Sequence, residues 1–104
     1  MALRFDGLEN GKAVHVDIDG APVAVVRIDD EVFAIHDKCS HADVRLSEGI
    51  VWCETKQIEC IRHGSLFNLE NGNADTLPAT QPVPVYAAEV VNGEVVVTIN
   101  GGAK

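Results

Sequence analysis

Residues 39–41 read Cys-Ser-His and residues 60–65 read Cys-Ile-Arg-His-Gly-Ser, and these two short stretches decide the fold. Each supplies one thiolate and one imidazole, and 18 residues lie between the two pairs. Because the two ligands of a pair are close in sequence, each loop can present both to one site with little ordering of the chain between them. Two cysteines and two histidines together form a metal-ligand set.

Two metal centres accept such a set. A zinc ion takes two Cys and two His tetrahedrally, and a Rieske [2Fe–2S] cluster takes two Cys on one iron and two His on the other. Structural zinc sites usually bring two cysteines together in one knuckle and two histidines in another. Here each pair is mixed, which favours the two-iron centre and leaves zinc as the alternative.

The surrounding sequence resembles the Rieske ferredoxin family. The resemblance rests on Cys39-x-His41 and Cys60-x₂-His63-Gly64, and extends over nearly the whole chain through Ala42-Asp43, Leu46 to Gly49, Phe67, Asn71-Gly72 and Leu77-Pro78. It implies an all-β fold of stacked antiparallel sheets with a small cluster-binding subdomain. It also implies that one [2Fe–2S] cluster is held by Cys39, His41, Cys60 and His63, with the histidines at the solvent edge as the electron exit.

Three further positions follow from the resemblance. Ser65 stands where high-potential members place a hydroxyl donor to the cluster, and Pro78 stands where a rigid loop closes over it, although Pro78 also suits an ordinary surface loop. Phe67 replaces the tyrosine that supplies a second hydroxyl, and the extra cysteine pair of high-potential members is absent. We therefore expect a midpoint in the lower part of the family's range of about −150 to +300 mV.

The resemblance implies a one-electron carrier between a flavin-dependent reductase and a terminal non-haem iron oxygenase. Such a carrier is not itself an enzyme. Residues 77–86 are also similar to Rieske ferredoxins associated with iron–sulfur cluster assembly, which would change the electron acceptor. A zinc-stabilised interaction module is the third interpretation. Oxygenase or assembly genes beside this one would distinguish the first two.

The rest of the sequence is typical of short antiparallel strands. Residues 12–18 alternate apolar and polar side chains, and residues 22–28 and 31–35 form further β-branched runs separated by turns. Residues 85–91 and 94–99 flank Asn92-Gly93, which predicts a hairpin with a type I′ turn. Residues 71–84, with Gly72 and three prolines, predict a loop.

Length, cysteine content and net charge indicate the number of domains, the cellular compartment and the class of partner. A chain of 104 residues fits one domain, taken as 1–104, with no second catalytic domain. No apolar run spans a membrane, and three cysteines without an export signal favour metal ligation in the cytoplasm over disulfides. The net charge of −8 argues against nucleic acid and suits a basic patch on a protein partner. A carrier that meets two partners in turn favours a monomer.

Other residues are expected to serve the fold. We predict that Cys53 is a buried small hydrophobe and that His15 is exposed beside Asp17. Trp52 is expected to pack in the core, with a contact to a partner protein as the alternative. His36 is expected to be structural or to support the ligands, because four ligands are available without it. Arg62 should stand near the cluster, where it either guides docking or offsets the charge of the reduced centre.

Overall fold

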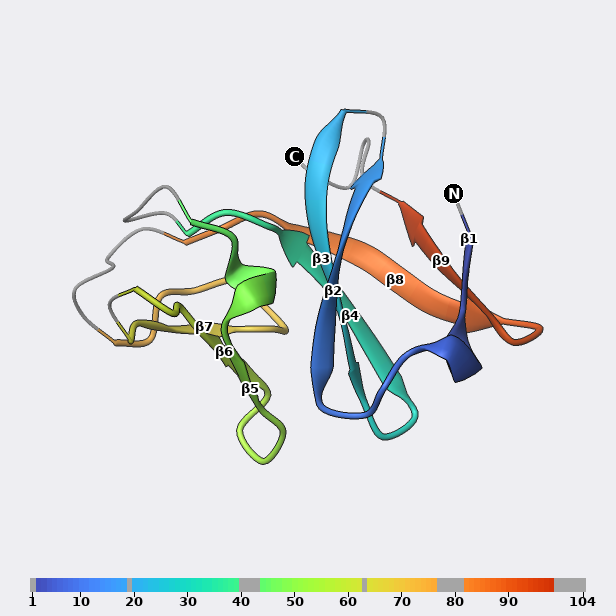
Figure 1. Ribbon diagram of the computed structural model, residues 1–104, viewed down its shortest axis with the longest axis horizontal. Helices are drawn as coiled ribbons and strands as arrows, with labels where there is room; N and C mark the ends of the chain where they lie inside the picture. The colour runs from blue at the N-terminus through green and yellow to red at the C-terminus, as the bar shows by residue number, and fades with distance from the viewer. Residues whose placement is uncertain (1, 19, 40–43, 63, 77–81, 99–104) are drawn as a thin grey trace.

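The computed structural model describes residues 2–18, 20–39, 44–62, 64–76 and 82–98 (Figure 1). These residues form a six-stranded and a three-stranded antiparallel sheet, which confirms the all-β prediction. In chain order the elements are β1 (Ala2–Arg4), a 3₁₀ turn η1 (Phe5–Gly7), β2 (Lys12–Ile18), β3 (Ala21–Ile28), β4 (Glu31–His36), a 3₁₀ turn η2 (Leu46–Glu48), β5 (Ile50–Trp52), β6 (Gln57–Glu59), β7 (Leu66–Asn68), β8 (Val85–Val91) and β9 (Glu94–Thr98).

The large sheet has the strand order β1-β9-β8-β4-β3-β2 and bends sharply between β4 and β8. Only two residue pairs join those strands, Ala34 with Tyr86 and Ile35 with Val85, whereas β2 and β3 pair along their whole length. In Figure 1, β2 and β3 therefore cross over the line of β8. A first core fills this bend and contains Val16 and Val25 from one half and Val95 from the other.

Strand β3 divides the molecule into two cores because its side chains alternate between the two faces of the sheet. Val23 and Val25 enter the first core, while Ala24, Val26 and Ile28 enter a second one. Val23 to Val26 are all completely buried, as expected for a central strand that is covered on both sides.

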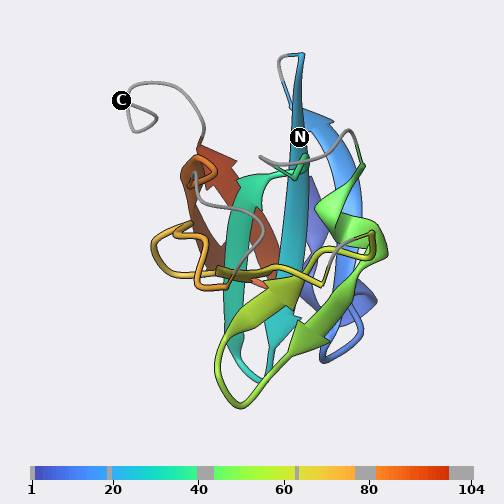
Figure 2. The same ribbon diagram turned by 90° about the vertical axis from the view of Figure 1, so that its left-hand side faces the viewer.

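The small sheet, in the order β5-β6-β7, covers the second face (Figure 2). Its central register aligns Val51 with Ile58 and Ile58 with Phe67. Ile58 and Phe67 are wholly buried in the second core, with Val51 packed against them. The small sheet lies in the chain between β4 and β8, so both candidate ligand loops belong to this inserted subdomain.

The predicted hairpins are confirmed. β2 and β3 pair antiparallel, as do β3 and β4, and Asn92 (φ 53°) with Gly93 (φ 80°) forms the turn between β8 and β9. Strands β1, β5, β6 and β7 were not predicted, because three residues are too few to show an alternating pattern. Among the described residues, no helix is long and apolar enough to cross a membrane.

Candidate functional site

The two candidate ligand loops are closed in the same way. The backbone N–H of Cys39 donates to the carbonyl of Val44 at 3.0 Å, and that of Cys60 donates to the carbonyl of Ser65 at 2.8 Å. Each bond joins a cysteine to the residue five positions later, so each loop begins at a cysteine and returns beside it. The second loop has a further bond from the N–H of Gly64 to the carbonyl of Cys60 at 2.9 Å.

Both cysteines lie at the base of these loops and inside the protein. Cys39 is 3% exposed and Cys60 is 0% exposed, and both belong to the second core. Neither is in a disulfide. The structure therefore places two buried cysteines, 21 positions apart in the chain and in no disulfide, in one core, which is the arrangement that thiolate ligands of a shielded metal centre need.

The structure describes only some of the remaining predicted cofactor-binding residues. His41 and His63 fall within the two loops, and His41, His63 and Pro78 all lie outside the described residues. Ser65 is described, and it is completely buried at the end of the second loop. Phe67, two residues later, is also completely buried.

The donor set fits a mixed-ligand metal centre. Within the described ranges, no three His, Cys, Asp or Glu side chains gather in a way that could hold a metal ion. A site built on Cys39 and Cys60 must therefore recruit further ligands from beyond those ranges. The two loops contain one histidine each, which matches the requirement of a two-cysteine, two-histidine set.

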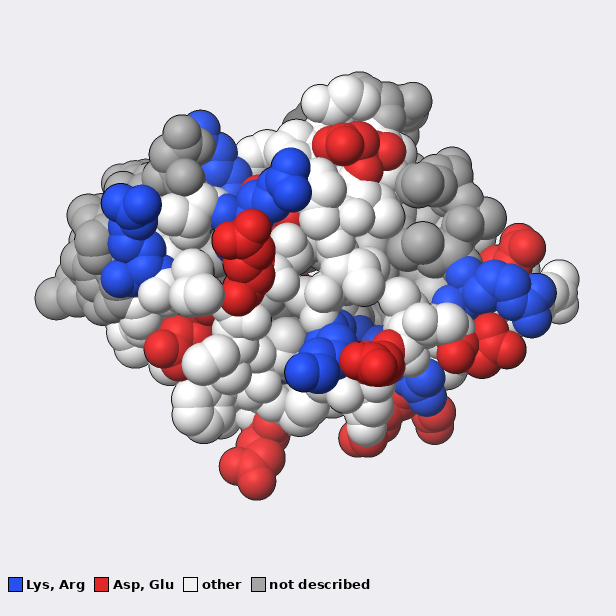
Figure 3. Space-filling view, in the orientation of Figure 1, with Lys and Arg blue, Asp and Glu red and all other residues white. Residues whose placement is uncertain are grey.

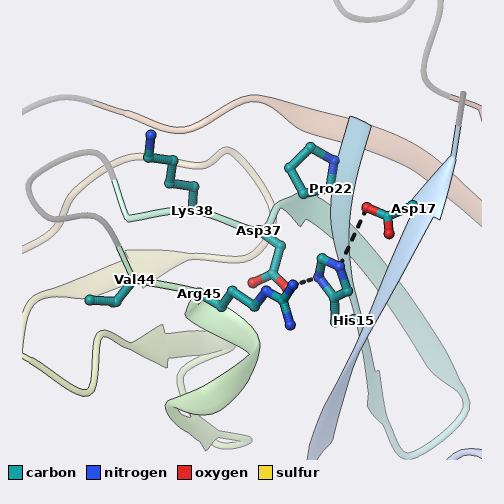
Figure 4. A pocket seen from close by; sticks show the side chains of 7 residues that line it. All are labelled: His15, Asp17, Pro22, Asp37, Lys38, Val44 and Arg45. Carbon is teal, nitrogen blue, oxygen red and sulfur yellow. Dashed lines mark hydrogen bonds and ion pairs between the residues drawn. The ribbon is translucent and has the colours of Figure 1, made fainter. Parts of the chain in front are cut away.

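A buried carboxylate anchors the first loop (Figure 4). Asp37 has a side chain with no exposed surface, two residues before Cys39. Its Oδ1 accepts the backbone N–H of Ser47 at 2.7 Å, and its Oδ2 accepts the Ser47 hydroxyl at 2.6 Å. Nδ1 of His15, on β2, lies 2.5 Å from the same Oδ2. These contacts join the segments on either side of the first loop and fasten both to the large sheet.

The prediction that His15 is exposed was wrong. Its side chain is 20% exposed, because η2 and the start of the first loop pack over that face of β2 and bring Asp37 to it. Its other nitrogen, Nε2, lies 3.4 Å from Asp17, as the sequence suggested. The role of Asp37 was missed because its partners are 10 and 22 positions away and no local pattern marks them.

His36 has the structural role that was predicted. Its Nδ1 lies 3.3 Å from the hydroxyl of Tyr86, and its backbone N–H donates to Pro84 at 2.9 Å. Burial raises the pKa of Tyr86, because the charged phenolate is poorly solvated there. The neutral hydroxyl therefore stays available as a partner for His36, and this contact helps to join β4 to β8 close to the first loop.

Two other predictions were wrong. Cys53 is exposed, in the turn that joins β5 to β6, and Trp52 is 47% exposed with its Nε1–H donating to Glu59 at 2.9 Å. Both lie at the end of β5, an edge strand of the small sheet. The turn extends beyond the second core, so neither side chain is enclosed. Arg62 and Ile61 are also exposed, on the second loop.

Comparisons with known proteins agree with this geometry. Residues 1–87 match the Rieske [2Fe–2S] domain family. The anthranilate 1,2-dioxygenase ferredoxin subunit of Burkholderia cepacia is 46% identical over 75% of this chain and 70% of that protein. The ferredoxin of carbazole 1,9a-dioxygenase from Nocardioides aromaticivorans IC177 is 36% identical, has a TM-score of 0.91 and covers 93% of each chain. A ferredoxin in complex with the reduced oxygenase of carbazole 1,9a-dioxygenase is 35% identical, with a TM-score of 0.85, over 91% of this chain and 96% of that one.

Proposed function

Because this chain belongs to the Rieske [2Fe–2S] domain family, we propose that it carries single electrons from a flavin-dependent reductase to a terminal non-haem iron oxygenase. The cluster, when bound, takes up one electron and gives it away again. We assign four residues as its ligands: Cys39, His41, Cys60 and His63. The observation that carries this assignment is the pair of buried cysteines, neither in a disulfide, at the base of two loops that close by equivalent hydrogen bonds.

The described residues of the chain support the ligands in three ways. The second core encloses both thiols and excludes water from them. The Asp37 carboxylate, through Ser47 and His15, holds the first loop against the large sheet. The buried hydroxyl of Ser65 is placed next to the second loop, and we assign it as a hydrogen-bond donor to the centre, with Pro78 as part of its cover.

The proposed electron acceptor is of the class that the names of the similar proteins indicate. The Burkholderia relative is named as a ferredoxin subunit of a dioxygenase, and one solved relative is a ferredoxin bound to an oxygenase. An electron acceptor of that class is therefore proposed here, with a flavin reductase as the donor. The genes beside this one test the choice, since oxygenase subunits support it and assembly scaffold components would favour cluster biogenesis.

We further propose that residues 1–104 form a single Rieske domain that works as a monomer in the cytoplasm. Strand β9 follows the matched residues 1–87, yet it pairs with β1 and β8 and places Val95 in the first core. The three cysteines are free thiols, as is usual in a reducing compartment. A monomer leaves the loop surface open to two partners in turn.

The ligand assignment is tested by replacing each ligand singly. We expect Cys39→Ser, His41→Ala, Cys60→Ser and His63→Ala to purify with little or no bound iron and sulfide. Cys53→Ser is the matched control, because Cys53 is exposed and lies outside the loops, and it should keep two irons and two sulfides per chain. Full iron content in any of the four variants would remove that residue from the ligand set.

A further inference from the structure

A carboxylate lies against the second loop, one residue before a proposed ligand. Glu59 is the last residue of β6, and Cys60 follows it directly. A Cβ built on Gly64 would lie 3.6 Å from Oε2 of Glu59, so the carboxylate reaches the part of the loop that bonds back to the Cys60 carbonyl. Glu59 is half-buried in this position. Its carboxylate is therefore close enough to act on the charge that the loop holds.

The small sheet fixes the backbone of Glu59. β6 is the central strand, and Glu59 is paired with Ile50 on β5 and with Leu66 on β7. Because the neighbouring Ile58 is buried in the second core, the side chain of Glu59 points to the outer face of the sheet. The backbone at Glu59 cannot shift without disturbing the pairing on both sides.

The indole of Trp52 holds the other end of this side chain. Trp52 lies on the same outer face, diagonally across from Glu59, and its Nε1–H donates to Oε1 at 2.9 Å. An indole N–H is a donor only, so it matches a carboxylate oxygen. Trp52 is 47% exposed and contributes little to either core. Its contact with Glu59 orients the carboxylate, with Oε1 on the indole and Oε2 toward the loop.

No described cation compensates the charge of Glu59. Within the part of the chain that the structure describes, this carboxylate forms no ion pair. Lys56, on the turn before β6, is bound instead by Glu31 at 3.0 Å and Glu70 at 3.7 Å. Arg62 is exposed on the second loop and is in no ion pair with Glu59. Glu59 therefore adds an uncompensated negative charge beside the second loop.

We propose that Glu59 lowers the reduction potential of the centre held by the two loops, and that Trp52 is the positioning residue that keeps its carboxylate there. The inference rests on the proposed function and adds a determinant of the potential outside the ligands and Ser65. Reduction adds one electron, and therefore one negative charge, which a fixed carboxylate nearby disfavours. Because Glu59 is half-buried, solvent screens this effect less than for a fully exposed carboxylate. A lower midpoint makes the reduced carrier a stronger donor to its electron acceptor.

Glu59→Gln tests the charge with little change of shape, because the amide keeps an oxygen that can accept the Trp52 N–H. In a redox titration followed by visible absorption, we expect the equilibrium constant for reduction to rise about two- to five-fold. This change corresponds to a midpoint higher by about 20–40 mV for one electron. The EPR signal of the reduced variant should keep its g values, because the substitution leaves the proposed ligands in place.

Glu54→Gln is the matched control, since it removes the same charge from an exposed side chain in the turn between β5 and β6. β6 separates this turn from the second loop. Figure 3 shows acidic side chains at the projecting lower tip of the small sheet and, apart from it, at the left-hand end, where the described parts of the loops lie in Figure 1. Charges more than about 8–10 Å apart are largely screened at physiological ionic strength, so the midpoint should stay nearly unchanged.

Trp52→Phe tests the positioning role. Phenylalanine keeps an aromatic ring but has no N–H, so the carboxylate loses its fixed orientation and can turn toward water. We expect the effect of Glu59→Gln on the equilibrium constant to fall below about two-fold when it is measured in the Trp52→Phe background.

Three outcomes would contradict the proposal or its premise, and they differ from one another. An unchanged midpoint in Glu59→Gln, or equal shifts in Glu59→Gln and Glu54→Gln, would overturn the proposal. A Glu59→Gln shift of the same size with and without Trp52 would overturn the positioning role of the indole. A starting protein with zinc and no visible absorption would instead contradict the proposed function, and the inference would fall with it.

Discussion

At the scale of single residues, Asp37 links the fold to the site. Its carboxylate accepts two hydrogen bonds from Ser47 and contacts His15, and none of its side chain is exposed. Hydrogen bonds to a charged group contribute about 1.5–3 kcal/mol each, and a buried donor that loses its acceptor costs a further penalty. The first loop therefore depends on one side chain that no local sequence pattern marks.

Asp37→Ala should be strongly destabilising. We expect the free energy of unfolding to fall by about 3–5 kcal/mol, because the variant leaves partly buried donors on Ser47 and His15 without an acceptor. Urea unfolding of the cluster-containing protein, followed by circular dichroism, measures the change. Asp17→Ala removes a 72% exposed carboxylate from the same histidine and should cost less than about 1 kcal/mol. Equal effects of the two variants would contradict the anchoring role of Asp37.

Ser65→Ala tests the proposed hydroxyl donor. Ser65 is completely buried beside the second loop, and loss of a hydrogen bond to the reduced, more negative centre should make reduction harder. Because only the difference in bond strength between the two redox states counts, loss of a bond of about 1.5–3 kcal/mol lowers the midpoint by at most about 60–130 mV for one electron. A redox titration followed by visible absorption measures the shift, with Cys53→Ser as the control. An unchanged midpoint would mean that the hydroxyl does not reach the centre.

At the scale of elements, glycine at position 49 lets the segment after the first loop pack against β6, the strand that leads into the second loop. Gly49 ends η2, and a Cβ built on it would lie 1.8 Å from the carbonyl oxygen of Glu59, next to Cys60. Its φ of −88° is open to any residue, so the requirement is for space and not for an unusual backbone conformation. The close approach joins the segment after the first loop to the strand that leads into the second.

Gly49→Ala should therefore disturb both loops at once. We expect it to lower the free energy of unfolding by at least about 2 kcal/mol and to reduce the bound iron, since backbone must move to admit the methyl group. Gly7→Ala is the control, because the atom nearest to its added Cβ is 3.9 Å away. Thermal unfolding and iron analysis of both variants provide the measurement, and a fully loaded, stable Gly49→Ala protein would contradict the packing argument.

The sequence predicted those elements that carry a local signal. Asn92-Gly93 and the alternation over residues 12–18 marked strands that pair as expected. The strands of the small sheet were not predicted, because each has three residues and is held by contacts between distant segments. The exposure of Trp52 and Cys53 and the partial burial of His15 depend on how the two sheets pack together. No single-strand pattern contains that information.

At the scale of the whole molecule, acidic residues outnumber basic ones, and the same holds at the ligand loops. The chain has a formal charge of −8, and residues 37–48 and 59–65 together hold four carboxylates and three cations. The proposed ligand motif could be recognised from sequence because its four residues lie in two short stretches, whereas the exposure of each charged side chain required the fold.

The proposed function depends on a [2Fe–2S] cluster with mixed cysteine and histidine ligation. The most direct test is an EPR spectrum of the purified protein before and after dithionite, with iron, sulfide and zinc quantified on the same sample. We expect two irons and two sulfides per chain, no signal when oxidised, and on reduction a signal whose average g value is below that of all-cysteine clusters. A colourless, EPR-silent protein with one zinc, or a reduced signal of the all-cysteine type, would contradict the central claim.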